Sequence, residues 1–212
     1  MHQPSRRGFL AGFGALTGAL ALFPDVAVAE PVADAAWDMT WLDRLKGKHR
    51  QVFDFSDLDI GLIVVKNWLD AWKNVYQLEH PKVNAVVGIG GHAFPVNASD
   101  ELYRKFPIGE LWKVNDPDTG KAAVRNIHLD GPATGGAVGA GVRPLQARGT
   151  IFWQCNNALN GVASRIGTAV KRPQPEVYQE LKAALNPGVI LVPAHTMLIG
   201  ICQERGCTYE GL

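Results

Sequence analysis

Residues 150–170 read TIFWQCNNALNGVASRIGTAV, six residues of strand character followed by a helical pattern. The first six residues are rich in β-branched and aromatic side chains, which is typical of a strand. The apolar side chains after them recur at steps of three and four residues, which places them on one helical face. They are Leu159, Val162, Ile166 and Val170. The segment therefore predicts a strand that leads directly into an amphipathic helix, with Asn156 or Asn157 as its N-cap.

The same alternation of strand and helix extends in both directions from this segment. Further strands are predicted at 51–55, 83–89, 189–192 and 207–209. Helical patterns lie between them: one is capped at Ser56 and Asp57 and runs to Tyr76, a short one is capped at Ser99, one begins at Pro175, and the last is capped at Thr196. Parallel strands need crossover connections of this kind. The pattern therefore predicts one α/β domain with a mostly parallel sheet.

Between Pro107 and Gly149 the pattern fails. This stretch includes a glycine-rich run from Gly131 to Gly141. An irregular connection of this length is uncommon inside a compact domain and is usually a lid, a ligand loop or an oligomer contact. We therefore predict a long loop insertion at 107–149 that lies over the ligand cleft or at a subunit contact.

The first 29 residues are predicted to be an export signal. Residues 5–10 read SRRGFL, an apolar run continues to Phe23, and residues 27–29 read AVA. This arrangement is typical of a twin-arginine signal, which predicts an exported, periplasmic protein whose mature domain is 30–212. The apolar run is shorter than the roughly 20 residues of a membrane anchor. We therefore expect no membrane span in the mature chain.

Composition excludes several classes of function. The chain has 212 residues, of which 47% are hydrophobic and 19% charged, with 21 basic and 20 acidic side chains. Removal of residues 1–29 takes away two arginines and one aspartate, which leaves a formal charge of zero. Such a balance offers no field for a polyanion, so nucleic-acid binding is not expected. Three cysteines are too few for a disulfide framework, and we expect Cys202 and Cys207 to be reduced and buried.

Reactive side chains follow three of the predicted strands. They are His92, which follows Gly90 and Gly91, Cys155 with Asn156 and Asn157, and His195. Because ligands of open parallel sheets bind at the carboxyl ends of the strands, we expect these side chains to share one cleft. Cys155 precedes a helix, whose N-terminal N–H groups favour a thiolate. It is the candidate nucleophile, with His92 or His195 as the base.

Other interpretations of these residues stay open. Cys155 can equally be a small buried core residue, and the histidines can be structural. A metal site would use His92, His195 and Cys155, with His128 from the long loop as a further ligand, and would suit zinc or copper. No close-spaced ligand pair supports it. His128 is also a candidate ligand-binding residue, together with Gly90, Gly91, Asn156 and Asn157.

A glycine pattern at 88–93, GIGGHA, matches the dinucleotide-binding fingerprint. That fingerprint needs a helix to begin at the turn, so that the helix N-terminus meets the pyrophosphate. Here the next helix is predicted to begin only at Ser99. We therefore interpret the glycines as a loop that allows close approach of the backbone, and we do not expect a dinucleotide.

Three segments of the C-terminal third carry a family resemblance. Residues 147–159 read ARGTIFWQCNNAL, 185–194 read LNPGVILVPA and 203–209 read QERGCTY. In order and spacing this part of the chain resembles the DsrE/DsrF-like family of sulfur-relay proteins and its exported relatives. The resemblance implies a three-layer fold with a five-stranded, mostly parallel sheet in flavodoxin-like order. It also implies homo-oligomers, often trimers or hexamers, and a cysteine that carries persulfide sulfur at the position of Cys155.

These observations lead to one main hypothesis and two alternatives. The main hypothesis is an exported DsrE-like protein that binds a small sulfur-containing or thiol-reactive ligand at the strand ends, with sulfur transfer through Cys155. The first alternative is a non-catalytic oligomer that binds a metal, a haem or another small ligand through His92 and His195. The second is an assembly scaffold whose long loop makes subunit contacts. The sequence does not identify a cofactor.

Overall fold

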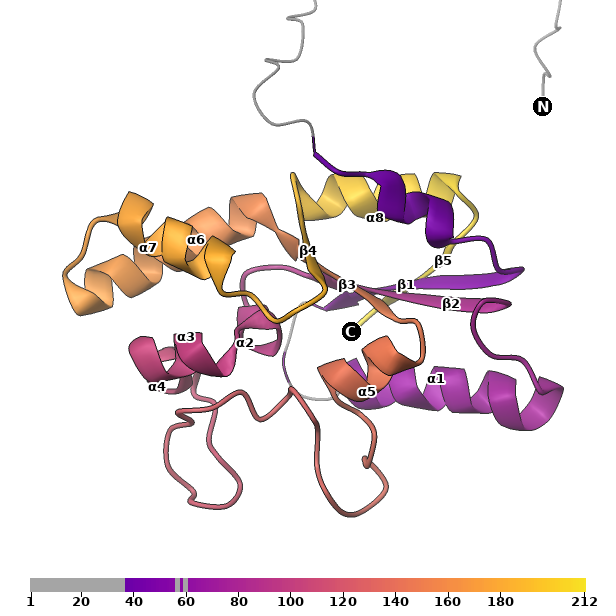
Figure 1. The fold of residues 1–212 in the computed structure, drawn as a ribbon, viewed down its shortest axis with the longest axis horizontal. Coiled ribbons are helices and arrows are strands. Elements are labelled where there is room, and N and C mark those ends of the chain that lie inside the picture. Colours follow the sequence, from indigo (N-terminus) through magenta and orange to yellow (C-terminus); the bar gives the residue numbers. More distant parts are fainter. Residues whose placement is uncertain (1–36, 56–57, 59–60) are drawn as a thin grey trace, which may run out of the picture. The chain divides into compact units, whose positions relative to one another are not determined.

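A sheet of five strands forms the centre of the protein in a computed structural model, which describes residues 37–55, 58 and 61–212 (Figure 1). The strands are β1 (His49–Phe55), β2 (Val83–Ile89), β3 (Ile151–Cys155), β4 (Val189–Val192) and β5 (Thr208–Gly211). All neighbouring strands are parallel and follow the order β4-β3-β2-β1-β5. The predicted α/β fold with a flavodoxin-like arrangement is confirmed. The predicted signal peptide and the cap at Ser56 and Asp57 lie outside the described residues.

Helices cover both faces of this sheet. One face carries η1 (Thr40–Arg44) and α8 (His195–Glu204), and the other carries α1 (Gly61–Tyr76) and α5 (Val142–Ala147) (Figure 1). Beside the sheet, α2 (Phe94–Asn97), α3 (Asp100–Lys105) and α4 (Ile108–Trp112) pack against α6 (Asn156–Val170) and α7 (Gln174–Ala183). Because only the connection through α8 runs back across the sheet, α8 lies on the face opposite to α1.

The central strands β2 and β3 are buried on both faces, whereas β5 at one edge of the sheet is exposed. Alternate residues of β1, β2 and β3 supply the two sides of the core. Val52, Val86 and Trp153 pack under η1 and α8. Their neighbours Phe53, Val87 and Phe152 face α1 and α5. This explains the continuous apolar runs of β2 and β3, since a strand covered on both faces has no polar side.

Within the part of the chain that the structure describes, no helix has both the length and the apolar character needed to cross a bilayer.

The stretch 107–149 differs from the predicted irregular loop. Helices α4 and α5 occupy its two ends, and an isolated bridge joins Asn115 to Ala122. The helical pattern was missed because each helix is only five or six residues long, too short for a recurring apolar face. Three buried side chains of the stretch, Leu129, Val142 and Leu145, belong to the core on the face of the sheet that α1 covers. Whether this stretch also contacts another subunit stays a prediction.

Two predicted helix caps are corrected by the structure. Helix α6 begins at Asn156, so its N-cap is Cys155 and neither of the two asparagines. Helix α8 begins at His195, with Ala194 as an N-cap that supplies no side-chain hydrogen bond, so Thr196 lies inside the helix. Both helices therefore begin one or two residues earlier than the sequence pattern indicated. The predicted cap at Ser99 is confirmed, since its side chain accepts a hydrogen bond from the N–H of Leu102 at 3.3 Å.

Candidate functional site

The sulfur of Cys155 lies where two helices begin. As the N-cap of α6, Cys155 accepts a hydrogen bond on Sγ from the N–H of Ala158 at 3.4 Å. The N–H of His195, the first residue of α8, donates to the same sulfur at 3.3 Å. A helix N-terminus carries unpaired N–H groups and a partial positive charge. Two backbone N–H groups, one from the beginning of each helix, are thus directed at this one sulfur.

The ring of His195 is held on both sides. Its Nδ1 is 3.1 Å from the indole Nε1 of Trp153, and its Nε2 is 2.6 Å from Oδ1 of Asp54. Because an indole N–H can only donate, Nδ1 is the acceptor and the ring proton lies on Nε2, which donates to Asp54. With both nitrogens engaged, the ring is not directed at Cys155. The base role predicted for this ring is therefore not favoured by the hydrogen bonding, and His195 reaches the sulfur through its backbone.

Asp54 links this histidine to the edge of the sheet. Its Oδ2 accepts a hydrogen bond from the hydroxyl of Tyr209 at 2.9 Å, while Oδ1 accepts from His195. This interaction raises the pKa of Tyr209, since the carboxylate accepts the hydroxyl proton. The sequence pattern predicted a role for neither Asp54 nor Tyr209. The available signal was a carboxylate in the otherwise apolar and aromatic end of the first strand, at the edge where parallel sheets bind ligands.

A glycine in β2 makes room for the two rings of this group. Gly88 lies beside Asp54 on one side and Trp153 on the other in the strand register. A Cβ at this position would come within 2.5 Å of the Trp153 ring and 2.8 Å of His195 Cε1. The absence of a side chain at Gly88 therefore lets the indole and the imidazole, whose planes are inclined by 67°, both pack against the centre of the sheet.

We expect Gly88→Ala to destabilise the protein by about 1–2 kcal/mol, because a methyl group would overlap two packed rings. Gly161 is a matched control, since it lies in α6 and a Cβ there meets no atom within 4 Å. Gly161→Ala should stabilise the protein by about 0.5–1 kcal/mol. Urea unfolding followed by circular dichroism measures both changes. Equal stability of the Gly88→Ala variant and the parent would contradict the packing argument.

The other residues predicted at the ends of the strands make fewer contacts with the group around Cys155 and His195. His92 is exposed in the turn before α2, and no hydrogen bond joins it to Cys155. Gly90 and Gly91 border open space: a Cβ on Gly90 would meet nothing within 4 Å, and one on Gly91 would meet only Ala158 at 3.8 Å. Asn157 is exposed, whereas Oδ1 of Asn156 accepts a hydrogen bond from Tyr178 at 2.6 Å.

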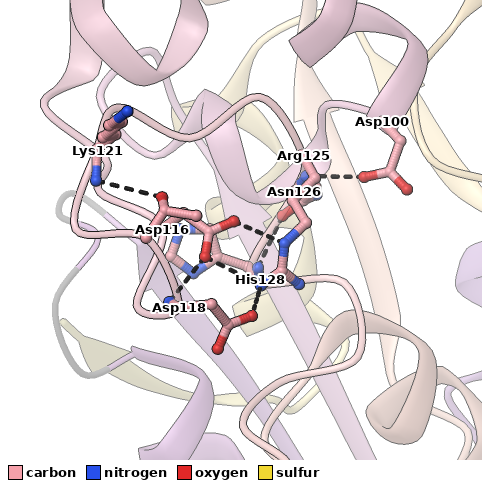
Figure 2. A network of polar contacts seen from close by, with 8 residues as sticks. Asp100, Asp116, Asp118, Lys121, Arg125, Asn126 and His128 are labelled. Carbon is pink, nitrogen blue, oxygen red and sulfur yellow. Dashed lines mark hydrogen bonds and ion pairs between the residues drawn. The ribbon is translucent and has the colours of Figure 1, made fainter.

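His128 lies on the other face of the sheet, next to a polar network in the 107–149 stretch (Figure 2). There Arg125 pairs with Asp116 through two hydrogen bonds of 2.7 and 3.1 Å and with Asp118 at 2.6 Å. The backbone N–H of His128 donates to Asn126 Oδ1, but its ring Nε2 is buried without a partner. Burial lowers the pKa of His128 to about 4. The residue lines a cavity of about 450 Å³ together with apolar side chains of α1.

The predicted metal site is not formed. Among residues 37–55, 58 and 61–212, no three His, Cys, Asp or Glu side chains gather closely enough to hold a metal ion. The reason lies in the partners of the three predicted ligands. The ring of His195 is engaged by Asp54 and Trp153, Cys155 Sγ accepts two backbone N–H groups, and His92 is exposed.

The other two cysteines are buried and free, as predicted. Gly206, with φ of +81°, ends α8 in a reversal in which its N–H donates to Gln203 O and that of Cys207 donates to Cys202 O. This capping motif brings the side chains before and after the reversal together. The hydrogen bond between the thiols of Cys202 and Cys207, together with burial, raises the pKa of Cys202. Neither thiol lies at the strand ends where Cys155 is placed.

Comparison of the chain with family models, with curated proteins and with solved structures gives no match.

Proposed function

We propose that this protein is a DsrE-like sulfur carrier in which Cys155 accepts sulfane sulfur from a small persulfide. The observation that supports the proposal is the position of Cys155 Sγ, which accepts N–H groups from the beginnings of α6 and α8 at 3.4 and 3.3 Å. A thiolate is the reactive form of cysteine in sulfur exchange. The two donors stabilise negative charge on the sulfur without a neighbouring base.

The proposed reaction needs no oxidant. The Cys155 thiolate attacks the outer sulfur of a persulfide R–S–SH, a new S–S bond forms, and the S–S bond of the donor breaks. The electron pair of that bond leaves with the donor sulfur as R–S⁻, and Cys155 becomes Cys–S–SH. The same exchange in reverse, with an acceptor thiolate, releases the sulfur. The oxidation states balance because one persulfide replaces another.

The surroundings of Cys155 suit a small ligand better than a large one. The residue is only 5% exposed, which limits access. The loop at Gly90 and Gly91 leaves space next to the beginning of α6: a Cβ on Gly90 would meet nothing within 4 Å, and one on Gly91 would fit in ordinary contact with Ala158 at 3.8 Å. A donor with a small terminal sulfur could approach along this loop. Asn157, exposed at the first turn of α6, lies at the same edge.

We expect Cys155 to react with iodoacetamide several times faster at neutral pH than Cys202 or Cys207. It alone accepts two backbone N–H groups from helix N-termini, whereas hydrogen bonding and burial raise the pKa of Cys202. The hydrogen bond with Cys202 lowers the pKa of Cys207, but the same bond engages the Cys207 sulfur and opposes its attack on the reagent. Quantitative mass spectrometry of the three cysteine peptides after brief labelling measures the rates. Labelling of Cys155 at the same rate as Cys202 or slower would leave the nucleophile without support.

The sulfur transfer itself is tested with glutathione persulfide as the donor. After incubation, the peptide that contains Cys155 should carry the added mass of one sulfur atom, and a reductant should remove it. Cys155→Ser should abolish the modification, and Cys207→Ser, a matched exchange at a buried cysteine, should leave it intact. Sulfur that accumulates on Cys202 or Cys207 instead would contradict the proposal.

We also propose that the protein works outside the cytoplasm as a homo-oligomer. The support is the twin-arginine pattern at residues 5–10 and the family resemblance of the C-terminal third. The near-zero charge expected for the mature chain adds to it, because it offers little repulsion between subunits.

A further inference from the structure

A cavity of about 510 Å³ lies at the amino-terminal edge of the sheet, the edge opposite to Cys155. It is lined by the beginnings of three neighbouring strands, at Asn84, at Ile151 and at Gly188 just before β4. Since β3 runs from Ile151 to Cys155, the two edges are about 13 Å apart along this strand. The cavity is therefore a separate feature from the proposed sulfur site.

The lining of this cavity mixes polar and apolar groups and contains no acidic residue. Besides the residues named above, it includes Arg44, His80, Gln146, Gly149, Thr150 and Pro187. Thr150 is 5% exposed, and its hydroxyl is buried without a hydrogen-bond partner. Asn84 is equally buried, and its Oδ1 accepts the N–H of Gly47 at 2.6 Å. A buried hydroxyl without a partner is unfavourable unless a ligand or water completes it.

Two glycines shape the walls around these groups. Gly149 has φ of +86°, and a Cβ there would come within 2.4 Å of the His80 ring. Gly188 has φ of +79°, and a Cβ there would lie 3.0 Å from Nε2 of Gln146. The side chains of His80 and Gln146 therefore occupy space that only glycine leaves free, and Gln146 is further fixed by its hydrogen bond of 3.0 Å to Pro187 O.

Positive charge is concentrated at the same edge. Residues 44–50 read RLKGKHR, and Lys82 lies directly against Gly47. Within the described part of the chain, none of Arg44, Lys46, Lys48 and Lys82 makes an ion pair. The carboxylates of Asp43 and Glu79 are already paired, with Arg205 and Lys73. The exposed carboxylate of Asp38 is hydrogen-bonded to Thr40 and interacts with Arg44 through its charge without an ion-pair contact. A chain of net charge +1 thus carries several cations without ion pairs beside the cavity.

We infer that this edge binds a small molecule that carries a phosphate or sulfate group. Arg44 lines the cavity and pairs with the oxyanion, and the hydroxyl of Thr150 and the amide of Asn84 supply hydrogen bonds inside it. The lysines around Gly47 line a neighbouring pocket and add positive potential from beside the cavity. This arrangement suits a compact, multiply charged group better than a single carboxylate. A volume near 500 Å³ is in the range of sites for small metabolites. This inference does not depend on the proposed role of Cys155.

The test is calorimetric titration of the full protein with inorganic pyrophosphate, and separately with inorganic sulfate, at low ionic strength. Arg44→Gln should weaken pyrophosphate binding by about tenfold or more, because it removes a charged hydrogen-bond donor. Thr150→Val should weaken it by roughly threefold to tenfold. It should not lower the thermal unfolding temperature, since the hydroxyl has no partner in the free protein. Arg143→Gln, the same exchange at an exposed arginine paired with Asp130, is the matched control.

Several results would overturn the inference. Absence of binding to both anions is one, and an equal loss in the Arg143→Gln variant is another, since it would indicate attraction by overall charge alone. Unchanged binding of pyrophosphate to the Thr150→Val variant would show that the cavity is not part of the binding site. Co-sedimentation with phosphatidylglycerol vesicles that is indifferent to Thr150→Val would assign the basic edge to a membrane surface. Binding that requires both Arg44 and Thr150 supports the inference.

Discussion

As the pH falls from about 6.5 to about 4, the free energy of unfolding of the parent protein is expected to fall by about 3 kcal/mol because of His128. In the His128→Leu variant this part of the fall should be absent. Burial lowers the pKa of His128 from 6.5 to about 4 in the folded protein. Above pH 6.5 the ring is neutral in both states and contributes nothing to the pH dependence. Between the two values only the unfolded chain binds the proton, so acid favours unfolding, by about 1.4 kcal/mol per pH unit.

The substitution of His128 by leucine should change the pH dependence with little other effect on stability. The ring Nε2 has no partner, so His128→Leu breaks no hydrogen bond of that atom, and the bond to Asn126 is made by the backbone N–H and persists. At neutral pH we expect the variant to be at least as stable as the parent. His92→Leu, the same exchange in an exposed turn, is the control. Urea unfolding at a series of pH values measures the effect, and parallel profiles for all three proteins would show that His128 is not held neutral by burial.

The fold could be predicted from the sequence because the strands and the longer helices each have a clear local pattern. The runs at 83–89 and 150–155 are mainly apolar, which is typical of strands covered on both faces, and both are buried. The order of the strands could not be derived from periodicity, because it depends on which edge β5 joins. That choice is made by α8, which returns across β3 and β2 on the opposite face to place β5 beside β1.

The candidate site was predicted only in part. Cys155 and His195 could be placed at one edge because Cys155 ends one predicted strand and His195 lies just after another, and the structure brings the sulfur and the His195 N–H together at 3.3 Å. The partners of His195 could not be found in this way. Asp54 and Trp153 lie within strands, and they meet the ring only because Gly88, between them in the register, has no side chain. A contact that depends on the register of three strands leaves no local sequence pattern.

The stretch 113–141 was also beyond prediction from periodicity, for a different reason. It is fixed mainly by side-chain hydrogen bonds to backbone far away in the sequence. Asn126 donates to the carbonyl groups of Val96 and Ala98 at 3.0 and 2.7 Å, and its own N–H donates to Asp100 at 2.7 Å. Such contacts order an irregular segment without any repeating apolar face. The composition of glycine, proline and aspartate there gave no sign of these contacts.

We expect Asp54→Ala to destabilise the protein by about 2–3 kcal/mol, because it leaves the Nε2–H of His195 largely buried without an acceptor. Asp54 joins β5, through Tyr209, to the first residue of α8, and its oxygens are 2.9 and 2.6 Å from those partners. The ring cannot turn to another acceptor without losing the indole N–H of Trp153 on its other side. The loss should therefore exceed that of an exposed ion pair, which contributes about 0–1 kcal/mol.

Two further variants separate this hydrogen-bonding role from a general effect of removing a carboxylate. Asp54→Asn keeps an oxygen that accepts from His195 and should retain stability to within about 1 kcal/mol of the parent. Asp43→Ala removes a carboxylate from an exposed pair with Arg205 and should cost less than about 1 kcal/mol. Urea unfolding of the three variants under one condition measures the differences. If Asp54→Ala were no more costly than Asp43→Ala, the position of the His195 ring would not depend on Asp54.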